Sequence, residues 1–335
     1  PRTGEMLMFA YDPLTPTLRY YVVDAGGALV HKVKFDLPAP VMMHDFIITE
    51  DHAVFLDSPI VFDIENMGKG PLVNWKPENG TRIGVMPRMG TADDLRWFEI
   101  EPGHVQHFWN GWAEGNRIEF SGCRYPAPDF GIDPTFPLDQ QVPKGDPGCP
   151  ARYWVDLDAG TAGWEALDDL PGDFNRINDD YNGVRSRYAY MSAYSGEIED
   201  LGYFDAIVKY DHDSGERTMW PAGDDAQVGE SVFAPDPEGT AEDDGWLINA
   251  VYDAAAEVFA THLKAGRNVV FLCQGDPFFF GSFSYVHERL NHQFNCEIVP
   301  GITAINASAA LSQTPLALLS ENFAVVSGRR GAEDI

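Results

Sequence analysis

The sequence predicts a mainly β fold over residues 1–253, followed by a shorter α/β segment over residues 254–335. Three observations predict this division. The first segment has short apolar runs between Gly-, Pro- and Asp-rich turns and no sustained helical period. The second segment alternates helical and strand patterns. The charge is also uneven: residues 1–254 hold 18 Lys/Arg and 45 Asp/Glu, whereas residues 255–335 hold 5 and 7.

The first segment is punctuated by turns, which separate the apolar or alternating runs typical of strands. We expect strands at residues 18–23, 53–56, 118–120, 206–210 and 246–252. The expected turns lie at residues 24–27, 77–80, 211–215 and 235–239. Many short strands joined by long polar loops favour a propeller or a large barrel.

The second segment opens with apolar residues at helical spacing, which predict a helix over residues 254–266 ended by Gly266. The patterns that follow predict strands at 269–273 and 296–299, and helices at 285–292 and 302–311. Such alternation is typical of a parallel sheet with crossover helices. The segment is short for a complete domain of this class.

The composition excludes some classes of protein. A net charge of −29 opposes binding to nucleic acid, since phosphate would be repelled. No apolar run reaches the roughly 18 residues of a membrane span, and no signal-peptide pattern is present. The four cysteines form no CxxC pair, so zinc and disulfide frameworks are disfavoured and a cytoplasmic location is expected.

Two histidines stand among apolar residues, His44 in PVMMHDF and His107 in EPGHVQHFWNGW. Each is either a metal ligand or a hydrogen-bonded core residue. His104 is three positions from His107, so the two should lie on opposite faces of a strand. Glu230 and Asp173 are acids that either orient an imidazole or occupy ordinary loop positions.

Two glycine turns in the second segment follow strand patterns, in CQGDPFFFGSF and VPGITAINASAA. The carboxyl ends of strands in open α/β sheets are where ligands bind, and the following helix N-terminus offers free N–H groups. Each turn is either a ligand loop or a generic strand–turn–helix connection.

Several segments of the first part occur in one order over about 250 residues. They are PRTGEM, DLPAPVMMHDFIITEDHAVFLDSPIVFD, TRIGVMPR, RWFEIEPGHVQHFWNGW, FNRINDDYNGVRSRYAY and GESVFAPDPEGTAEDDGWLINAVYD. Together they resemble the carotenoid cleavage oxygenase family, particularly its bacterial members that include lignostilbene dioxygenases. The resemblance implies a seven-bladed β-propeller. It also implies a non-haem Fe(II) held by four histidines, which three glutamates support, and oxidative cleavage of a conjugated C=C bond by O2.

The resemblance assigns His44 and His107 as two of the four iron ligands. Glu230 matches one supporting glutamate. Asp173 falls where another supporting glutamate is usual, and its shorter side chain leaves open whether it reaches its histidine. The other two ligands and one glutamate have no counterpart here, so the resemblance implies a propeller lacking its N- and C-terminal parts, with an incomplete iron site.

The second part, through GDPFFFGSF and PGIT, resembles the tetrapyrrole methylases, in particular precorrin-2 C20-methyltransferase of cobalamin biosynthesis. This family binds S-adenosylmethionine. The resemblance implies that the cofactor contacts fall on Gly275, Asp276, Pro277, Phe280, Gly281, Ser282, Pro300, Gly301, Ile302, Thr303 and Ala304.

Three functions remain open. The first is an Fe(II) dioxygenase acting with O2 on a small apolar conjugated substrate such as a carotenoid, apocarotenoid or stilbene, impaired by missing ligands. The second is an S-adenosylmethionine-dependent methyltransferase. The third is an inactive composite of two gene fragments, joined near Tyr252–Ala255. We expect the chain to have little dioxygenase activity.

Overall fold

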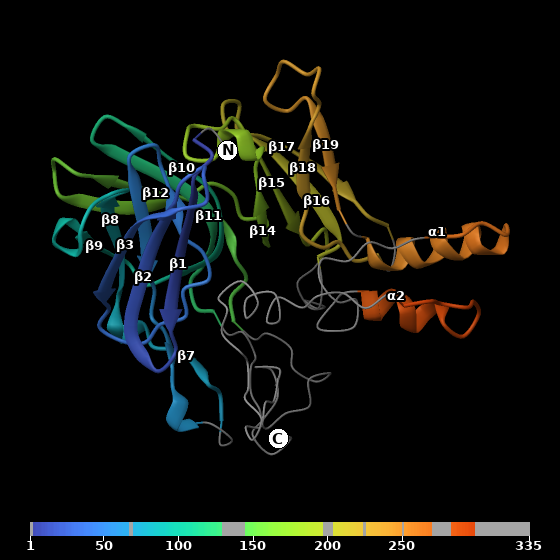
Figure 1. Ribbon diagram of the computed structural model, residues 1–335, viewed down its shortest axis with the longest axis horizontal. Coiled ribbons are helices and arrows are strands. Elements are labelled where there is room, and N and C mark those ends of the chain that lie inside the picture. The colour runs from blue at the N-terminus through green and yellow to red at the C-terminus, as the bar shows by residue number, and fades with distance from the viewer. Residues whose placement is uncertain are drawn as a thin grey trace.

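A computed structural model describes residues 3–66, 70–128, 145–196, 204–223, 226–249, 251–269 and 283–298. In this part of the chain, strands dominate up to residue 248 and two helices follow (Figure 1). The sequence-based expectation of a mainly β first segment is confirmed.

The strands pair antiparallel in sheets whose strands mostly follow chain order, as in the blades of a propeller. The first sheet holds β1 (Met6–Asp12), β2 (Thr15–Val23) and β3 (Leu29–Asp36). The second holds β4 (Ile47–Ile48), β5 (His52–Asp57), β8 (Thr81–Pro87) and β9 (Arg96–Ile100), and the hairpin β6 (Ile60–Phe62) and β7 (Val73–Trp75) is inserted within it.

The third sheet holds β10 (His104–Glu114), β11 (Arg117–Tyr125), β12 (Cys149–Asp156) and β13 (Thr161–Ala166). The fourth holds β14 (Gly172–Arg176), β15 (Tyr188–Ala193), β16 (Ala206–Asp211) and β17 (Glu216–Pro221). The last pair is β18 (Val232–Pro235) with β19 (Gly245–Ile248).

Apolar side chains fill the spaces between successive sheets, and β5 shows how. Ala53 and Phe55 join the core against the first sheet, whereas Val54 and Leu56 join the core against the third. Side chains alternate faces along a strand, so a strand covered on both faces reads as a continuous apolar run. A further core lies between the third and fourth sheets.

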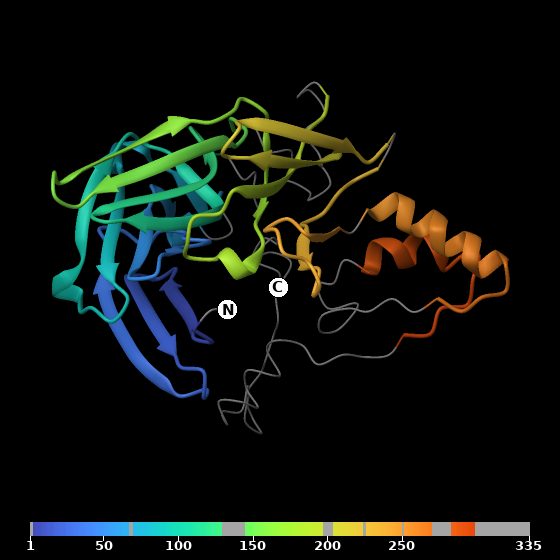
Figure 2. The ribbon, with the colours of Figure 1, turned by 90° about the horizontal axis from the view of Figure 1, so that it is seen from above.

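The first strands of three sheets lie together, since β10 contacts both β4 and β14. The sheets fan outward from them, as the view from above shows (Figure 2). The loops and strands nearest these three strands therefore meet at the centre of the arrangement, and the candidate site lies there.

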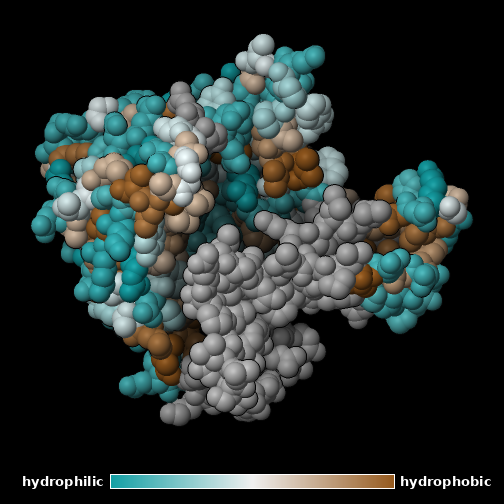
Figure 3. Space-filling view, in the orientation of Figure 1, coloured by the Kyte–Doolittle hydropathy of each residue, from teal (hydrophilic) through white to brown (hydrophobic). Residues whose placement is uncertain are grey.

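The two-stranded pair β18–β19 exposes apolar side chains. Val232, Trp246 and Ile248 are each more than half exposed, and apolar colour gathers on this pair in Figure 3. The predicted strand over 246–252 is shorter in the structure, because β19 ends at Ile248 and a helix begins at Tyr252.

Helices α1 (Tyr252–Lys264) and α2 (Phe283–Leu290) pack on each other through Phe259, Leu263, Val286 and Leu290. Gly266, with a φ of 73°, follows α1 and donates to the Leu263 carbonyl, as a helix-ending glycine does. The helices predicted over 254–266 and 285–292 therefore exist, with ends shifted by about two residues.

The predicted strand over 296–299 is not present in residues 296–298, since no described strand pairs with them and a strand needs a hydrogen-bonded neighbour. The helix expected over 302–311 and most of the strand expected over 269–273 lie outside the described residues. Within the described part, neither helix is long and apolar enough to span a membrane.

Candidate functional site: a histidine pair at the centre of the sheets

His44 lies in the loop between β3 and β4, and its direction follows from its neighbours. Val41 and Met43 are buried in the core between the first two sheets, and Val41 also pairs with Val61 of β6. Because side chains alternate along an extended chain, burying these two residues turns His44 the other way. Its side chain is exposed toward the centre of the sheets.

His107 comes from β10, and the structure brings it to His44. The two imidazole rings have centroids 4.6 Å apart and planes at 77°. The expected placement of His104 on the opposite face of this strand is not confirmed, because the β10 register shifts between Val105 and Phe108 and both of these residues join the same core. His104 makes contacts of its own. It is 2% exposed, with Nδ1 2.7 Å from Ser58 Oγ and Nε2 2.9 Å from Gln106 Oε1, and burial lowers its pKa to about 4. His104 is thus a neutral core residue.

Asp173 reaches His107, although its side chain is one methylene shorter than that of glutamate. His107 Nδ1 donates to Asp173 Oδ1 at 3.0 Å, and Tyr125 donates its hydroxyl to Oδ2 at 2.5 Å. The reason is the backbone of β14. Its register shifts after Asp173, and Phe174 takes a φ of 57°, which no other described non-glycine residue does. This bulge brings the shorter acid close to the imidazole.

The two imidazoles differ in their electrostatic surroundings. Loss of hydration, followed by repulsion from His107, lowers the pKa of His44, although a hydrogen bond with the backbone of Gln106 opposes this. Burial also lowers the pKa of His107, but the hydrogen bond and charge of Asp173 outweigh burial and leave it raised. His44 is therefore neutral at pH 7, the form in which a histidine ligates metal.

Glu230 does not bond to a histidine. Its Oε1 pairs with Arg176 Nη2 at 2.5 Å, and both side chains are about 40% exposed. Its charge still contributes to the raised pKa of His107. The supporting role expected for Glu230 remains a prediction.

The donor set fits part of a metal centre. Asp173 occupies Nδ1 of His107, which leaves Nε2 as the free ligand atom, the arrangement usual for metal-bound histidines. Neutral imidazoles suit Fe(II). Among the described residues, no group of three or more His, Cys, Asp or Glu side chains is placed to hold a metal. The pair therefore fits as two ligands of a larger set.

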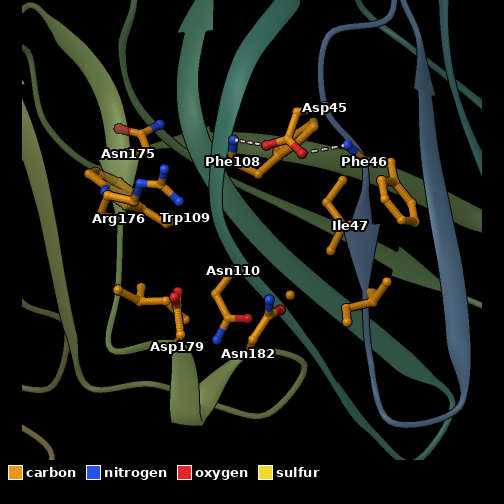
Figure 4. Close-up of a pocket in the computed structure, with 13 residues that line it drawn as sticks. Asp45, Phe46, Ile47, Phe108, Trp109, Asn110, Asn175, Arg176, Asp179 and Asn182 are labelled. Carbon is orange, nitrogen blue, oxygen red and sulfur yellow. Dashed lines mark hydrogen bonds between the residues drawn. The ribbon is translucent and has the colours of Figure 1, made fainter. Parts of the chain in front are cut away.

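A cavity of about 150 Å³ is lined by Asp45 and Phe108, which follow the two histidines in the chain, and by Asn175 and Arg176 among others (Figure 4). Sequence reasoning did not find Tyr125 or Asn175, because neither stands in a metal-ligand pattern. All eleven residues assigned to S-adenosylmethionine lie outside the described part of the chain.

The family model for retinal pigment epithelial membrane protein (RPE65) matches residues 1–266. The chain belongs to this family, which includes the carotenoid cleavage oxygenases. A second model, for tetrapyrrole (corrin/porphyrin) methylases, matches residues 205–335. The two matches overlap, so the domain boundary near residue 253 stays a prediction.

Individual relatives and solved structures that match the chain carry names typical of the same family. Carotenoid 9,10(9',10')-cleavage dioxygenase 1 of Pisum sativum is 29% identical over 88% of this chain and 58% of its own length. The lignostilbene dioxygenase structure from Pseudomonas brassicacearum matches with a TM-score of 0.67 and 28% identity, over 75% of this chain and 56% of that one. The structure of a cobalt-substituted Synechocystis ACO matches with a TM-score of 0.64 and 26% identity, over 75% of this chain and 53% of that one. The chain thus spans little more than half the length of these relatives.

Proposed function

We propose that His44 and His107 form half of the non-haem Fe(II) centre of an oxygenase that cleaves a conjugated C=C bond. The observation that carries the proposal is the convergence of the two rings, with Asp173 hydrogen-bonded to one of them. The cleavage dioxygenases among the relatives support a carotenoid, apocarotenoid or stilbene as the substrate class and O2 as co-substrate.

The residues of this chain would act by holding the ligand nitrogens still. The Asp173 carboxylate keeps the proton of His107 on Nδ1, and the backbone of Gln106 holds one ring nitrogen of His44. Each imidazole then presents its other nitrogen toward the centre. When bound, Fe(II) supplies the redox chemistry with O2 that breaks the double bond.

Cobalt binding tests the centre directly, since Co²⁺ has visible absorption bands and is stable in air. The purified chain is expected to bind Co²⁺ through His44 and His107, and His44→Ala or His107→Ala should each weaken the bands strongly while leaving a measurable residual affinity. His292→Ala, at an exposed position on the segment after α2, is the control. Equal binding by all four proteins would refute the proposed centre.

Cleavage is tested separately, by chromatography of the carbonyl products from a stilbene and an apocarotenoid with Fe(II) and O2. Because the described residues supply two histidines, we expect little turnover. Robust turnover that disappears in His107→Ala would show that two histidines suffice and would correct this expectation.

A second candidate function, transfer of a methyl group from S-adenosylmethionine, is supported by the methylase match over residues 205–335. Calorimetric titration with S-adenosylmethionine tests it. Micromolar binding that Asp276→Ala removes would favour this function, and absence of binding heat would exclude it for this chain.

A further inference from the structure

The peptide group that joins His107 to Phe108 is held by two side chains. Strand β10 is irregular at this point, because its register against β11 shifts both before and after Phe108. The Phe108 N–H donates to Asp45 Oδ2 at 2.9 Å. The carbonyl of His107, on the other side of the same peptide, accepts from Asn175 Nδ2 at 2.6 Å.

Both side chains are themselves held in place. Asp45 Oδ1 accepts from the N–H of Phe46 at 2.8 Å, so each carboxylate oxygen has a backbone partner (Figure 4). Asn175 is 4% exposed, and its Oδ1 accepts from the thiol of Cys123 at 3.3 Å. The orientation of the Asn175 amide is thus set by a donor on one side and an acceptor on the other.

These contacts join the segments that carry the site. Asp45 directly follows His44, and Asn175 lies two residues after Asp173 on β14. At a β-bulge the regular hydrogen bonds to the neighbouring strand are interrupted, so they no longer fix the direction of the side chain there. Bulges near functional sites commonly turn a side chain in a new direction. A peptide held from both sides restores a single direction for His107.

We propose that Asp45 and Asn175 are positioning residues that clamp the His107–Phe108 peptide and thereby aim the His107 imidazole at His44. The metal-binding consequence rests on the proposed function, whereas the clamp and the ring arrangement do not. Neither residue needs to touch a metal or a substrate.

Two isosteric variants test the clamp. Asp45→Asn places an amide NH2 where one backbone N–H needs an acceptor, and Asn175→Asp places a carboxylate oxygen against the His107 carbonyl. The matched control is Asp24→Asn, since Asp24 also accepts two backbone N–H bonds, from Gly26 and Ala28, in the β2–β3 turn. We expect amide exchange at Phe108 to accelerate at least tenfold in Asp45→Asn and to be unchanged in Asp24→Asn.

Ring positions are read without metal, from nuclear Overhauser contacts between the His44 and His107 ring protons in protein labelled on histidine. The wild type and Asp24→Asn should show the contact, and both clamp variants should weaken or lose it. A contact retained at full strength in both clamp variants would overturn the proposal, whether or not the protein binds cobalt.

Cobalt affinity then separates positioning from general stability. Outer partners of ligand histidines typically change metal affinity by about 10- to 100-fold, so we expect a loss in that range for each clamp variant. In a His107→Ala background, Asp45→Asn should change the remaining affinity little. An equal loss in both backgrounds would mean that Asp45 acts elsewhere and would refute the inference. If only cobalt binding fails in the wild type, the proposed function fails and the ring contacts still decide the clamp.

Discussion

Lengthening the acid that holds His107, by Asp173→Glu, is expected to damage the site, although the family resemblance predicts a glutamate at this position. The Asp173 side chain is 5% exposed and already meets the His107 imidazole at 3.0 Å and the Tyr125 hydroxyl at 2.5 Å. Because the side chain is buried and both of its oxygens are bonded, we expect an added methylene to overpack the site, which typically costs about 1–3 kcal/mol. Phe174 has a left-handed backbone conformation, which costs about 1–2 kcal/mol, and this conformation places the shorter side chain of Asp173 against the imidazole.

The assay is urea unfolding followed by tryptophan fluorescence, together with Co²⁺ titration of the same samples. Asp173→Glu should lower the free energy of unfolding by about 1–3 kcal/mol and weaken cobalt binding. Asp213→Glu, at an exposed ion pair with Arg185, controls for the longer side chain. A variant that is as stable as the wild type and binds cobalt more tightly would refute the reasoning and show that Asp173 is too short.

Three further predictions concern pH, packing and solubility. Because burial lowers the pKa of His104 from 6.5 to about 4, the unfolded chain protonates first as the pH falls. The free energy of unfolding should therefore decrease between about pH 6.5 and pH 4, by up to ~3 kcal/mol from this group. Urea unfolding at several pH values should show that His104→Gln lacks this decrease and that the control His292→Gln retains it. Gly122→Ala would place a Cβ 2.9 Å from the His107 carbonyl oxygen, so urea unfolding should show a loss of about 1–3 kcal/mol; an unchanged midpoint would contradict this. Ile248→Ser, at a position 60% exposed on β19, should reduce light scattering on concentration without lowering the unfolding midpoint, and increased scattering would argue against an exposed apolar surface there.

Local pattern was enough to predict most of the strands and turns. The run around Ala53 and Leu56 became β5, and the Asp- and Gly-rich residues before β3 became its turn, because strand period and turn chemistry act over a few neighbouring residues. The same alternation did not apply between His104 and His107, because the register of β10 shifts between them. The end of β19 was not predictable in this way, since an apolar stretch fits a strand and a helix start equally well.

Local pattern could not predict contacts between distant residues, and only the family resemblance indicated that His44, His107 and Asp173 belong to one site. Asp173 is 66 positions from the histidine it holds, and the side chain of Asp45 meets the Phe108 N–H across 63 positions. The contact of Asn175 could not be predicted, because nothing in its sequence neighbourhood distinguishes it from an ordinary asparagine in a loop. Glu230 had the residue type expected for a histidine partner, yet it pairs with Arg176, which lies nearer in the folded chain.

The sequence alone predicted a β-rich segment, an α/β-like continuation and two candidate ligand histidines. These predictions rest on the alternation of apolar and polar residues, on turn residues and on motifs, all of which are read directly from the order of residues. Tertiary structure decided which of these groups meet. The packing of sheets side by side brings the loop before β4, the bulge in β10 and the bulge in β14 to one point. Hydrogen bonds that depend on a few tenths of an ångström, such as the one from His107 to Asp173, form only after that packing is in place.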